Sequence, residues 1–160
     1  MGRSGGPVND DGAPLDAVDK AIVEALQVDG RLPYSELGPM VGLSQAAVRQ
    51  RVKRLLDAGV MQVVAVTDPA SLGFGLQALV GISVEGDLRA VAAALAAVDE
   101  IEYVVITTGR FDVFAEVVCT DTSALLDLVN DRIRPIEGVR ATEVFTYLDL
   151  VKQTYSWGTR

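Results

Sequence analysis

The clearest pattern of apolar and polar positions lies between residues 44 and 58. Four apolar residues recur there with the spacing i, i+4, i+7 and i+8 of one helix face: Val48, Val52, Leu55 and Leu56. This spacing is typical of an amphipathic α-helix. Ser44 is a suitable N-cap for it, and Gly42 supplies the backbone freedom for a tight turn just before it. Gly59 is a natural end. The pattern predicts a turn followed by a helix over residues 44–58.

The opposite face of this predicted helix carries small and basic side chains. At about 100° per residue, Ala46, Ala47, Gln50, Lys53 and Arg54 share that face, with Arg49 and Arg51 on its flanks. Small side chains allow a close approach to a DNA groove, and cations reach phosphates. The residues predicted to contact DNA are Ser44, Gln45, Ala46, Ala47, Arg49, Gln50, Lys53 and Arg54.

Two further helices are predicted before this one. The first spans about 16–28, with Asp16 as its N-cap and a stop at Asp29-Gly30. The second spans about 35–41, with Ser35 as its N-cap, which would place Pro39 in the first turn, where a missing N–H matters least. Three helices with a tight turn between the second and third form a helix-turn-helix unit over residues 15–60.

The second half of the chain has a different pattern. A short apolar strand is expected at 60–66, within a strand-and-linker segment over 61–75. Further strands are predicted at 76–84, 101–108, 111–119 and 141–150, and helices at 87–98 and 122–133. The order β-α-β-β-α-β is the ferredoxin-like arrangement. The predicted fold class is α+β: an N-terminal three-helix helix-turn-helix (winged-helix-like) domain and a C-terminal ferredoxin-like βαββαβ domain over 76–151.

The two ends of the chain are expected to lie outside these domains. Residues 1–14 are rich in Gly, Pro, Ser and Asp, which predicts a disordered tail, and residues 152–160 form a C-terminal tail. In the ferredoxin-like domain, both helices cover one face of the sheet. The other face is apolar and needs a partner, so we expect the protein to form homodimers.

Charge is divided unevenly along the chain. The net charge is −8 at pH 7, which is unexpected for a DNA-binding protein. Residues 15–60, however, contain six acidic and six basic residues, and residues 77–151 contain thirteen acidic and five basic residues. The acidity therefore belongs to the C-terminal half, where it would weaken non-specific DNA binding without preventing the basic helix from reaching its site.

Residue usage argues against catalysis and metal binding. The chain has no histidine and one cysteine, Cys119, which excludes Ser-His and Cys-His catalysis, an internal disulfide and a multi-cysteine metal site. We predict no catalytic residue, no metal site and no cofactor. The chain has no apolar run long enough to span a membrane and no signal-peptide pattern at its start, so a cytoplasmic protein is expected.

Four short motifs follow one another along the chain: residues 15–19 (LDAVD), Asp29-Gly30-Arg31, Val41-Gly42-Leu43-Ser44 and residues 109–112 (GRFD). In that order they resemble the opening "LDxxD", the stop after the first helix, the helix-turn-helix turn and the "GxxD" turn of the ligand domain in the Lrp/AsnC (feast/famine) family of amino-acid-responsive transcriptional regulators. The likeness covers about residues 15–155. Gly38-Pro39 and Ala46-Ala47 depart from the usual pattern, and the two alanines leave base readout to Gln45, Gln50 and DNA shape.

The resemblance implies partners as well as a fold. It implies binding to double-stranded DNA, dimers that associate further into octamers, and an amino-acid effector bound at a subunit interface. Backbone N–H groups of the 109–112 turn suit a carboxylate, and Asp112 suits an α-ammonium group. The predicted effector-binding residues are Thr108, Gly109, Arg110, Phe111, Asp112, Phe145, Thr146 and Tyr147.

Two alternatives remain from the sequence. In one, the protein is an oligomeric metabolite-binding module with little or no DNA-binding activity. In the other, it is a small enzyme on a ferredoxin-like fold, which the missing histidine and the missing acid–base cluster argue against. DNA binding that depends on the basic face of the 44–58 helix separates the regulator from both.

Overall fold

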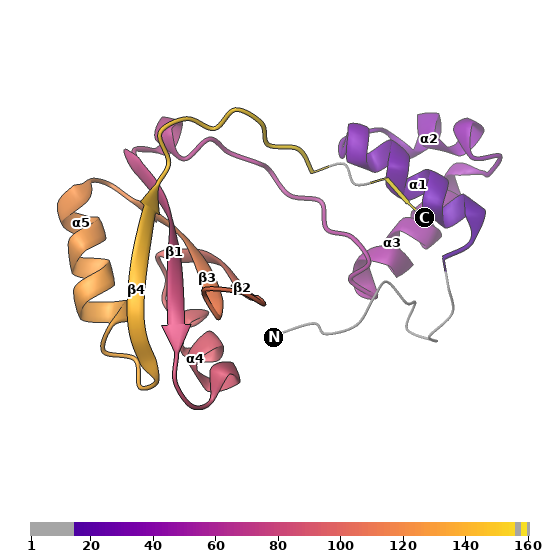
Figure 1. The fold of residues 1–160 in the computed structure, drawn as a ribbon. Coiled ribbons are helices and arrows are strands. Elements are labelled where there is room, and N and C mark those ends of the chain that lie inside the picture. Colours follow the sequence, from indigo (N-terminus) through magenta and orange to yellow (C-terminus); the bar gives the residue numbers. More distant parts are fainter. Residues whose placement is uncertain (1–14, 156–157, 160) are drawn as a thin grey trace. The chain divides into compact units, whose positions relative to one another are not determined.

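The computed structural model describes residues 15–155 and 158–159. The chain divides into two compact units (Figure 1). One contains the chain up to Ala65 together with the segment from Lys152 onwards, and the other is Val66–Val151. The tail predicted over residues 1–14 lies outside the described residues.

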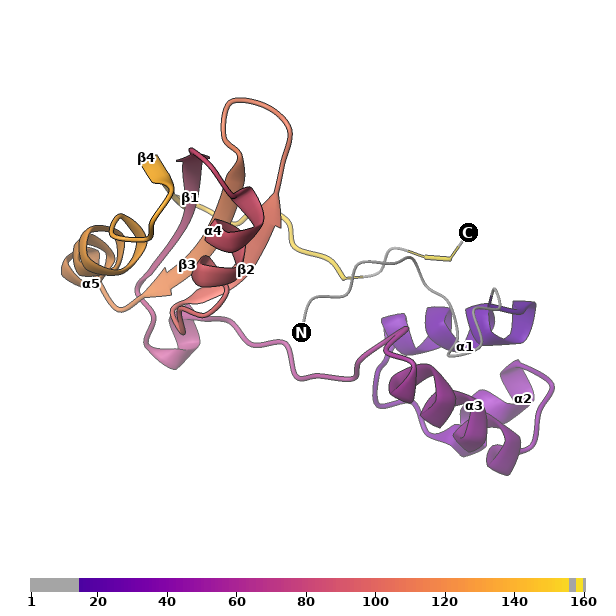
Figure 2. The same ribbon diagram turned by 90° about the horizontal axis from the view of Figure 1, so that it is seen from below.

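The described residues of the first unit form three helices, which Figure 2 shows from a second side: α1 (Ala17–Val28), α2 (Tyr34–Met40) and α3 (Gln45–Asp57). The predicted N-caps of the first and third helices are confirmed, since the Asp16 carboxylate accepts from the Asp19 amide and the Ser44 hydroxyl accepts from the Ala47 amide. The core of the unit is formed by side chains from all three helices: Ile22, Val23, Leu37, Val48, Val52 and Leu55.

The second helix differs from its prediction. The Pro33 carbonyl accepts from the amides of Glu36 and Leu37, so α2 begins at Tyr34 and Ser35 is not its N-cap. Pro39 consequently lies in the last turn of α2, where the prediction had placed it in the first. The helix ends one residue later, so the ring of Pro39 interrupts little of it.

The strand predicted over residues 60–66 is wrong. These residues are not in a strand, and the side chains of Val63, Val64 and Val66 are more than half exposed. A strand requires a hydrogen-bonded neighbour, and every strand among the described residues lies further along, between Leu76 and Thr146. Apolar composition alone therefore did not suffice to form a strand here.

The C-terminal segment returns to the first unit. The Gly158 amide donates to Gln27 Oε1 at 3.2 Å, and the Thr159 hydroxyl is hydrogen-bonded to Glu24. Both partners lie on α1, so part of the predicted C-terminal tail contacts the helical unit.

The second unit is a four-stranded antiparallel sheet with two helical segments. Its strands are β1 (Leu76–Val84), β2 (Ile101–Ile106), β3 (Val113–Cys119) and β4 (Val139–Thr146), in the spatial order β2-β3-β1-β4. The helices are α4 (Leu88–Leu95), capped by Asp87, and α5 (Thr122–Asp127), which continues as a π-helix over Leu128–Ile133; a short 3₁₀-helix spans Ala70–Leu72. The predicted β-α-β-β-α-β order is confirmed. Several elements end two to four residues earlier than predicted or begin up to two residues later, and β4 begins two residues earlier, at Val139.

One face of the sheet is covered by the helices. The alternate residues of β1 and β3 that face α4 and α5 are fully buried: Ala78, Val80, Ile82, Val113, Ala115 and Val117. Cys119 belongs to the same core, and burial raises the pKa of its thiol, which keeps it protonated near neutral pH. No helix among the described residues is long and apolar enough to cross a membrane.

Candidate nucleic-acid interface and ligand turn

The third helix is held by its apolar side and presents its polar side to solvent. Val48, Val52 and Leu55 are at most 1 % exposed. The turn before α3 is closed by the Leu43 amide, which donates to the Gly38 carbonyl at 2.9 Å, and by Gly42, whose φ of 70° is in the left-handed region. This turn and the Ser44 cap define where α3 begins, as the sequence predicted.

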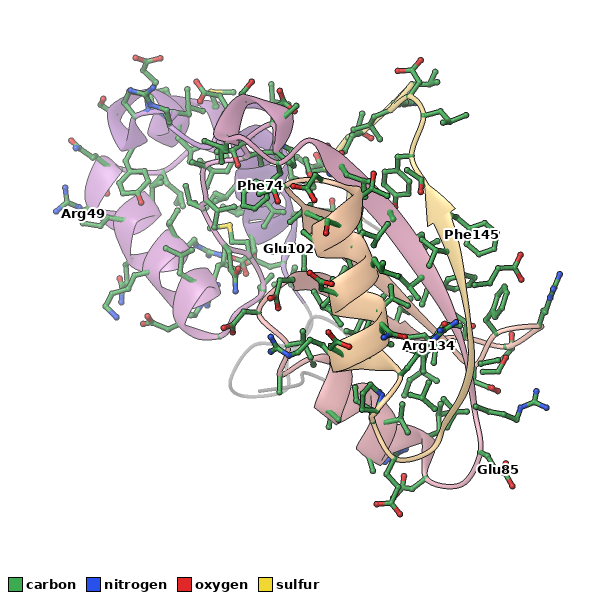
Figure 3. All side chains as sticks on the ribbon, turned by 90° about the vertical axis from the view of Figure 1, so that its left-hand side faces the viewer. Arg49, Phe74, Glu85, Glu102, Arg134 and Phe145 are labelled. Atoms are coloured by element: carbon green, nitrogen blue, oxygen red, sulfur yellow. The ribbon has the colours of Figure 1, made fainter. Side chains whose placement is uncertain are left out.

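The solvent side of α3 contains most of the residues that the sequence assigned to DNA. Gln45, Ala46, Arg49, Gln50 and Lys53 are exposed, and Ala47 is half-buried. Arg49 points away from the helices (Figure 3), and Lys53 forms an exposed ion pair with Asp57 one turn later. The first turn of α3 thus presents Gln45 and two alanines to solvent, and the following turns present Gln50 and the cations Arg49 and Lys53.

Arg54 has a different environment from the other residues of this predicted set. Its Nη2 lies 2.7 Å from both carboxylate oxygens of Asp19 on α1. The sequence placed Arg54 with Lys53 on the DNA side, but the arginine side chain reaches back to the neighbouring helix.

The turn between β2 and β3 contains the predicted effector motif. Residues 107–112 form a loop closed by the Thr107 amide, which donates to the Asp112 carbonyl at 2.9 Å, and by the Thr107 hydroxyl, which donates to the Phe111 carbonyl at 2.7 Å. The amides of Thr108, Gly109 and Arg110 donate no hydrogen bond to any other residue that the structure describes. Gly109 has a φ of 141°, which disfavours other residues there.

Two side chains of this turn fold over the face of the sheet that α4 and α5 leave open. Arg110 forms an ion pair with Glu143 of β4 at 3.0 Å, and its guanidinium lies 5.3 Å from the Phe111 ring centroid. The Phe111 ring makes edge-to-face contacts with Phe114 at 5.5 Å and Phe145 at 5.9 Å between centroids. Figure 3 shows Phe145 pointing away from α5, in agreement with this open face.

Asp112 has a structural role at the base of the turn. Its Oδ2 accepts from the Val84 amide at 2.8 Å, and its own amide donates to the Ile82 carbonyl at 3.0 Å. These bonds tie the turn to the end of β1. One carboxylate oxygen of Asp112 is therefore already engaged before any ligand binds.

The remaining predicted effector residues do not join this cluster within one subunit. Thr146 pairs with buried Ala78 and so alternates toward the helix-covered face. The Tyr147 hydroxyl donates to Glu116 Oε1 at 3.1 Å, and its amide donates to the Gln77 carbonyl, near the start of β1. Burial first, and the bond to Glu116 second, raise the pKa of Tyr147 to about 12. The phenol therefore remains protonated at neutral pH.

Three residues of these sites were missed by sequence reasoning. Asp19 is 1 % exposed, and it lies three residues before Ile22, on the buried side of α1. Gly81 lies directly beneath Phe111, since a Cβ at this position would be 2.8 Å from the ring. Glu143 holds Arg110. The available signals were an acid on an apolar helix face and a glycine inside a strand, which often marks close approach.

Comparisons with known proteins agree over both units. Residues 15–56 match the AsnC-type helix-turn-helix domain, and residues 75–160 match a family described as a C-terminal dimeric alpha+beta barrel domain of AsnC-type regulators. The HTH-type transcriptional regulator FL11 of Pyrococcus furiosus is 36 % identical over 142 residues, which cover 88 % of this chain and 93 % of that protein.

Two solved structures have similar folds along nearly the whole chain. The structure of Escherichia coli AsnC has a TM-score of 0.78 and 27 % identity, covering 89 % of this chain and 98 % of that one. A transcriptional regulator of Neisseria meningitidis, solved as a complex with L-Met, has a TM-score of 0.78 and 33 % identity, covering 89 % and 96 %.

Proposed function

The chain belongs to the Lrp/AsnC family of helix-turn-helix transcriptional regulators, and from that premise we propose how it binds DNA. The observation that carries the proposal is the exposed surface of α3, small at its start and basic beyond it. This helix enters the major groove with its N-terminal residues toward the bases, as recognition helices do. The contacting residues are Ser44, Gln45, Ala46, Ala47, Arg49, Gln50 and Lys53.

The chemistry of these side chains separates those that contact bases from those that contact phosphates. The side-chain amides of Gln45 and Gln50 suit paired donor and acceptor contacts to adenine, and Ala46 and Ala47 suit a close approach to thymine methyl groups. Arg49 and Lys53 reach phosphates, which gives affinity and register but no sequence information. With so few base-reading side chains, DNA shape contributes to selectivity.

The open face of the sheet is the surface through which two copies associate. It presents large side chains that stay substantially exposed in one subunit, among them Tyr103 at 57 % and Phe145 at 41 %. The dimeric description of the matching domain family supports a second copy of this chain as the partner. A dimer presents two α3 helices to two half-sites one helical turn apart. We propose that such dimers associate further into octamers, as the resemblance to the Lrp/AsnC family implies.

The β2–β3 turn is the place for an amino-acid effector. Its unbonded amides at Thr108, Gly109 and Arg110 suit a carboxylate, and the L-Met complex of the related Neisseria meningitidis protein supports an amino acid as the ligand class. The second oxygen of Asp112 suits the α-ammonium group. Because Thr146 and Tyr147 lie away from this turn in one subunit, they complete the site only if another subunit supplies them. We place the protein in the cytoplasm, with its DNA.

The test is a mobility-shift titration at fixed salt, using a labelled duplex from the region upstream of the protein's own gene. We expect specific binding that changes with one member of an amino-acid panel. The double variant Arg49→Ala/Lys53→Ala should bind at least tenfold more weakly. The matched control Arg89→Ala, which removes an exposed cation from α4 in the other unit, should bind like the wild type.

Each outcome bears on a separate part of the proposal. Wild-type affinity in the Arg49/Lys53 variant would show that α3 is not the DNA-contacting helix. Specific binding that ignores every amino acid would remove the effector role of the β2–β3 turn. If the wild type binds amino acids but no DNA, the protein is the metabolite-binding module that the sequence left open.

A further inference from the structure

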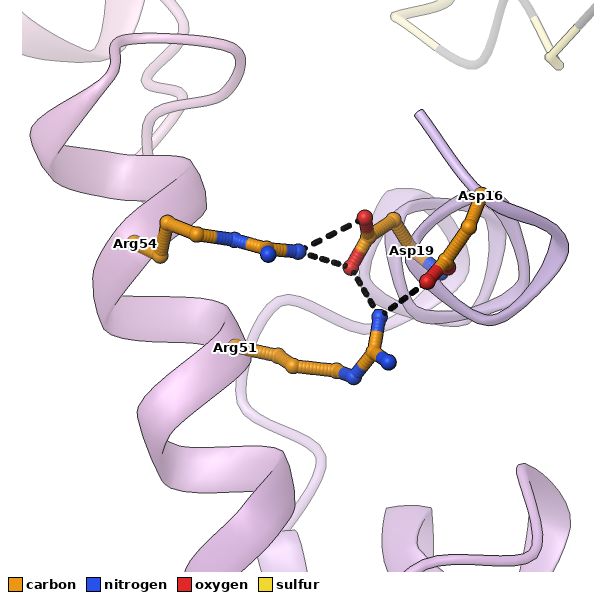
Figure 4. Close-up of polar contacts among 4 residues, drawn as sticks. All are labelled: Asp16, Asp19, Arg51 and Arg54. Carbon is orange, nitrogen blue, oxygen red and sulfur yellow. Dashed lines mark hydrogen bonds and ion pairs between the residues drawn. The ribbon is translucent and has the colours of Figure 1, made fainter. Parts of the chain in front are cut away.

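A buried carboxylate joins the first helix to the recognition helix. Asp19 is 1 % exposed, and it lies between two arginines of α3 (Figure 4). Arg51 Nη1 donates to Asp19 Oδ1 at 2.8 Å, and Arg54 Nη2 lies 2.7 Å from both of its oxygens. Arg51 also donates to Asp16 at 2.6 Å. We name these four residues the Asp19 cluster.

The Asp19 cluster is electrically balanced, with two carboxylates and two guanidinium groups. A carboxylate so deeply buried is stable only with partners that satisfy it, and both side-chain partners come from a single helix. Arg51 and Arg54 are three residues apart on α3, so together they favour one rotation of that helix about its axis. Rotation of α3 would break the pairs and leave the charge of Asp19 buried without compensation.

The cluster also changes which cations are available to DNA. Residues 45–57 of α3 contain four: Arg49, Arg51, Lys53 and Arg54. Two of them are neutralised by Asp16 and Asp19. Arg49 is exposed with its side chain pointing outward, and Lys53 is 73 % exposed and forms a surface ion pair with Asp57.

We propose that Asp19 is a positioning residue for DNA binding. It sets the rotation of the recognition helix and withholds Arg51 and Arg54 from the phosphates, so that Arg49 and Lys53 are the phosphate-contacting cations of α3. This inference rests on the proposed function and adds a division of labour among the cations of one helix.

The experiment measures how DNA affinity depends on salt in the full-length protein. The probe is a fluorescein-labelled 30-bp duplex of mixed sequence, followed by anisotropy across a potassium chloride series. The slope of log K against log salt counts the phosphates neutralised, at about 0.9 per contact. The variants are Arg49→Ala, Arg54→Gln and Asp19→Asn, and urea unfolding of each provides a separate measure of the fold.

The three variants have different expected results. Arg49→Ala should lower the slope by about one per subunit while leaving the unfolding midpoint unchanged. Arg54→Gln should leave the slope unchanged, lower the midpoint, and weaken binding by a similar factor, about tenfold, at every salt concentration. Asp19→Asn should steepen the slope, because it releases arginines from a carboxylate, a change that a purely structural role would not produce.

Two results would overturn the proposal. A fall in slope with Arg54→Gln, as large as that with Arg49→Ala and without loss of stability, would make Arg54 a phosphate contact. If Arg54→Gln leaves the salt slope, the DNA affinity and the urea unfolding midpoint unchanged, the Asp19 cluster does not position α3.

Two further measurements separate this inference from the proposed function. If Asp19→Asn does not fold, the double variant Asp19→Asn/Arg54→Gln decides: it should regain the fold, because Arg51 keeps Asp16 as its partner and the other guanidinium has been removed together with the carboxylate. If the wild type binds no duplex at any salt, the proposed function fails, and with it the claim about phosphates. The urea unfolding midpoints of the wild type, Arg54→Gln and the double variant then still show whether the contact of Asp19 with Arg54 stabilises the position of α3.

Discussion

Gly38 lies where α2 approaches the turn before α3, and its replacement by alanine should destabilise the helix-turn-helix unit. A Cβ at this position would be 2.7 Å from the Leu43 carbonyl oxygen, closer than real Cβ contacts occur, and 3.6 Å from the Gln45 amide. The obstacle is backbone, so no change of rotamer relieves it. The Leu43 amide also donates to the Gly38 carbonyl, which links the two segments directly.

Two opposing effects determine the magnitude. Alanine in place of glycine favours a helix by up to about 1 kcal/mol, while an added methyl group in a closely packed site costs about 1–3 kcal/mol. Because α2 has only seven residues and its contact is with a hydrogen-bonded turn, the steric cost prevails. We expect Gly38→Ala to lower the free energy of unfolding by about 1–2 kcal/mol, which at typical slopes lowers the urea midpoint by roughly 0.5–1 M.

The assay is urea unfolding followed by circular dichroism, with Gly30→Ala as the matched control. Gly30 lies in the same unit, and a Cβ added there would meet its nearest atom, Val63 Cγ1, at an ordinary contact distance of 3.6 Å. The control should remain within about 0.5 kcal/mol of the wild type. If Gly38→Ala is as stable as the control or more stable, the close approach does not explain the glycine, and the reasoning is refuted.

Three further predictions concern the second unit and the first helix cap. Gly81→Ala should displace the Phe111 ring and so raise the dimer dissociation constant about tenfold, as measured by analytical sedimentation. An unchanged constant would contradict the proposal that two copies associate through the open face of the sheet. Asp112→Ala should abolish the amino-acid response and, by leaving the half-buried Val84 amide without its acceptor, lower the free energy of unfolding by about 1–3 kcal/mol, whereas a normal response would place the effector elsewhere. The Asp19 amide first, and an arginine of α3 second, lower the pKa of Asp16 below 3.8. The ionised carboxylate therefore stabilises the fold above about pH 4, and this contribution is lost as the pH falls through the lowered pKa. The stability difference between wild type and Asp16→Asn should accordingly be smaller at pH 3 than at pH 7 in urea unfolding; an equal difference would contradict the assignment.

Most elements of both units could be predicted because their signals are local. The caps at Asp16 and Ser44 act on amides three residues away, and the spacing of Val48, Val52 and Leu55 identifies the buried side of α3. The bounds of β1 follow from an apolar run between two glycine-containing turns. Interactions of this kind are encoded within a few residues and survive almost any tertiary arrangement.

The errors in the prediction concern places where a distant group decides the outcome. Residues 60–66 have strand-forming composition, but no strand in the described part of the chain pairs with them. The start of α2 depends on which carbonyl accepts from the first helical amides. The Pro33 carbonyl does so, and Ser35 therefore lies within the helix and not at its N-cap. Neither competition can be decided from spacing alone.

The sequence by itself determined the identity of the protein's parts: three helices with a recognition helix, a β-α-β-β-α-β sheet, and the family to which they belong. Only the tertiary structure decided how the charged and aromatic residues are used. Arg54 and Lys53 are neighbours in sequence, yet one pairs with Asp19, 35 residues away, and the other stays exposed. The ring of Phe111, in the β2–β3 turn, packs against Gly81 of β1. Helical periodicity gives the direction of a side chain, but the partner it meets depends on where the rest of the chain has folded.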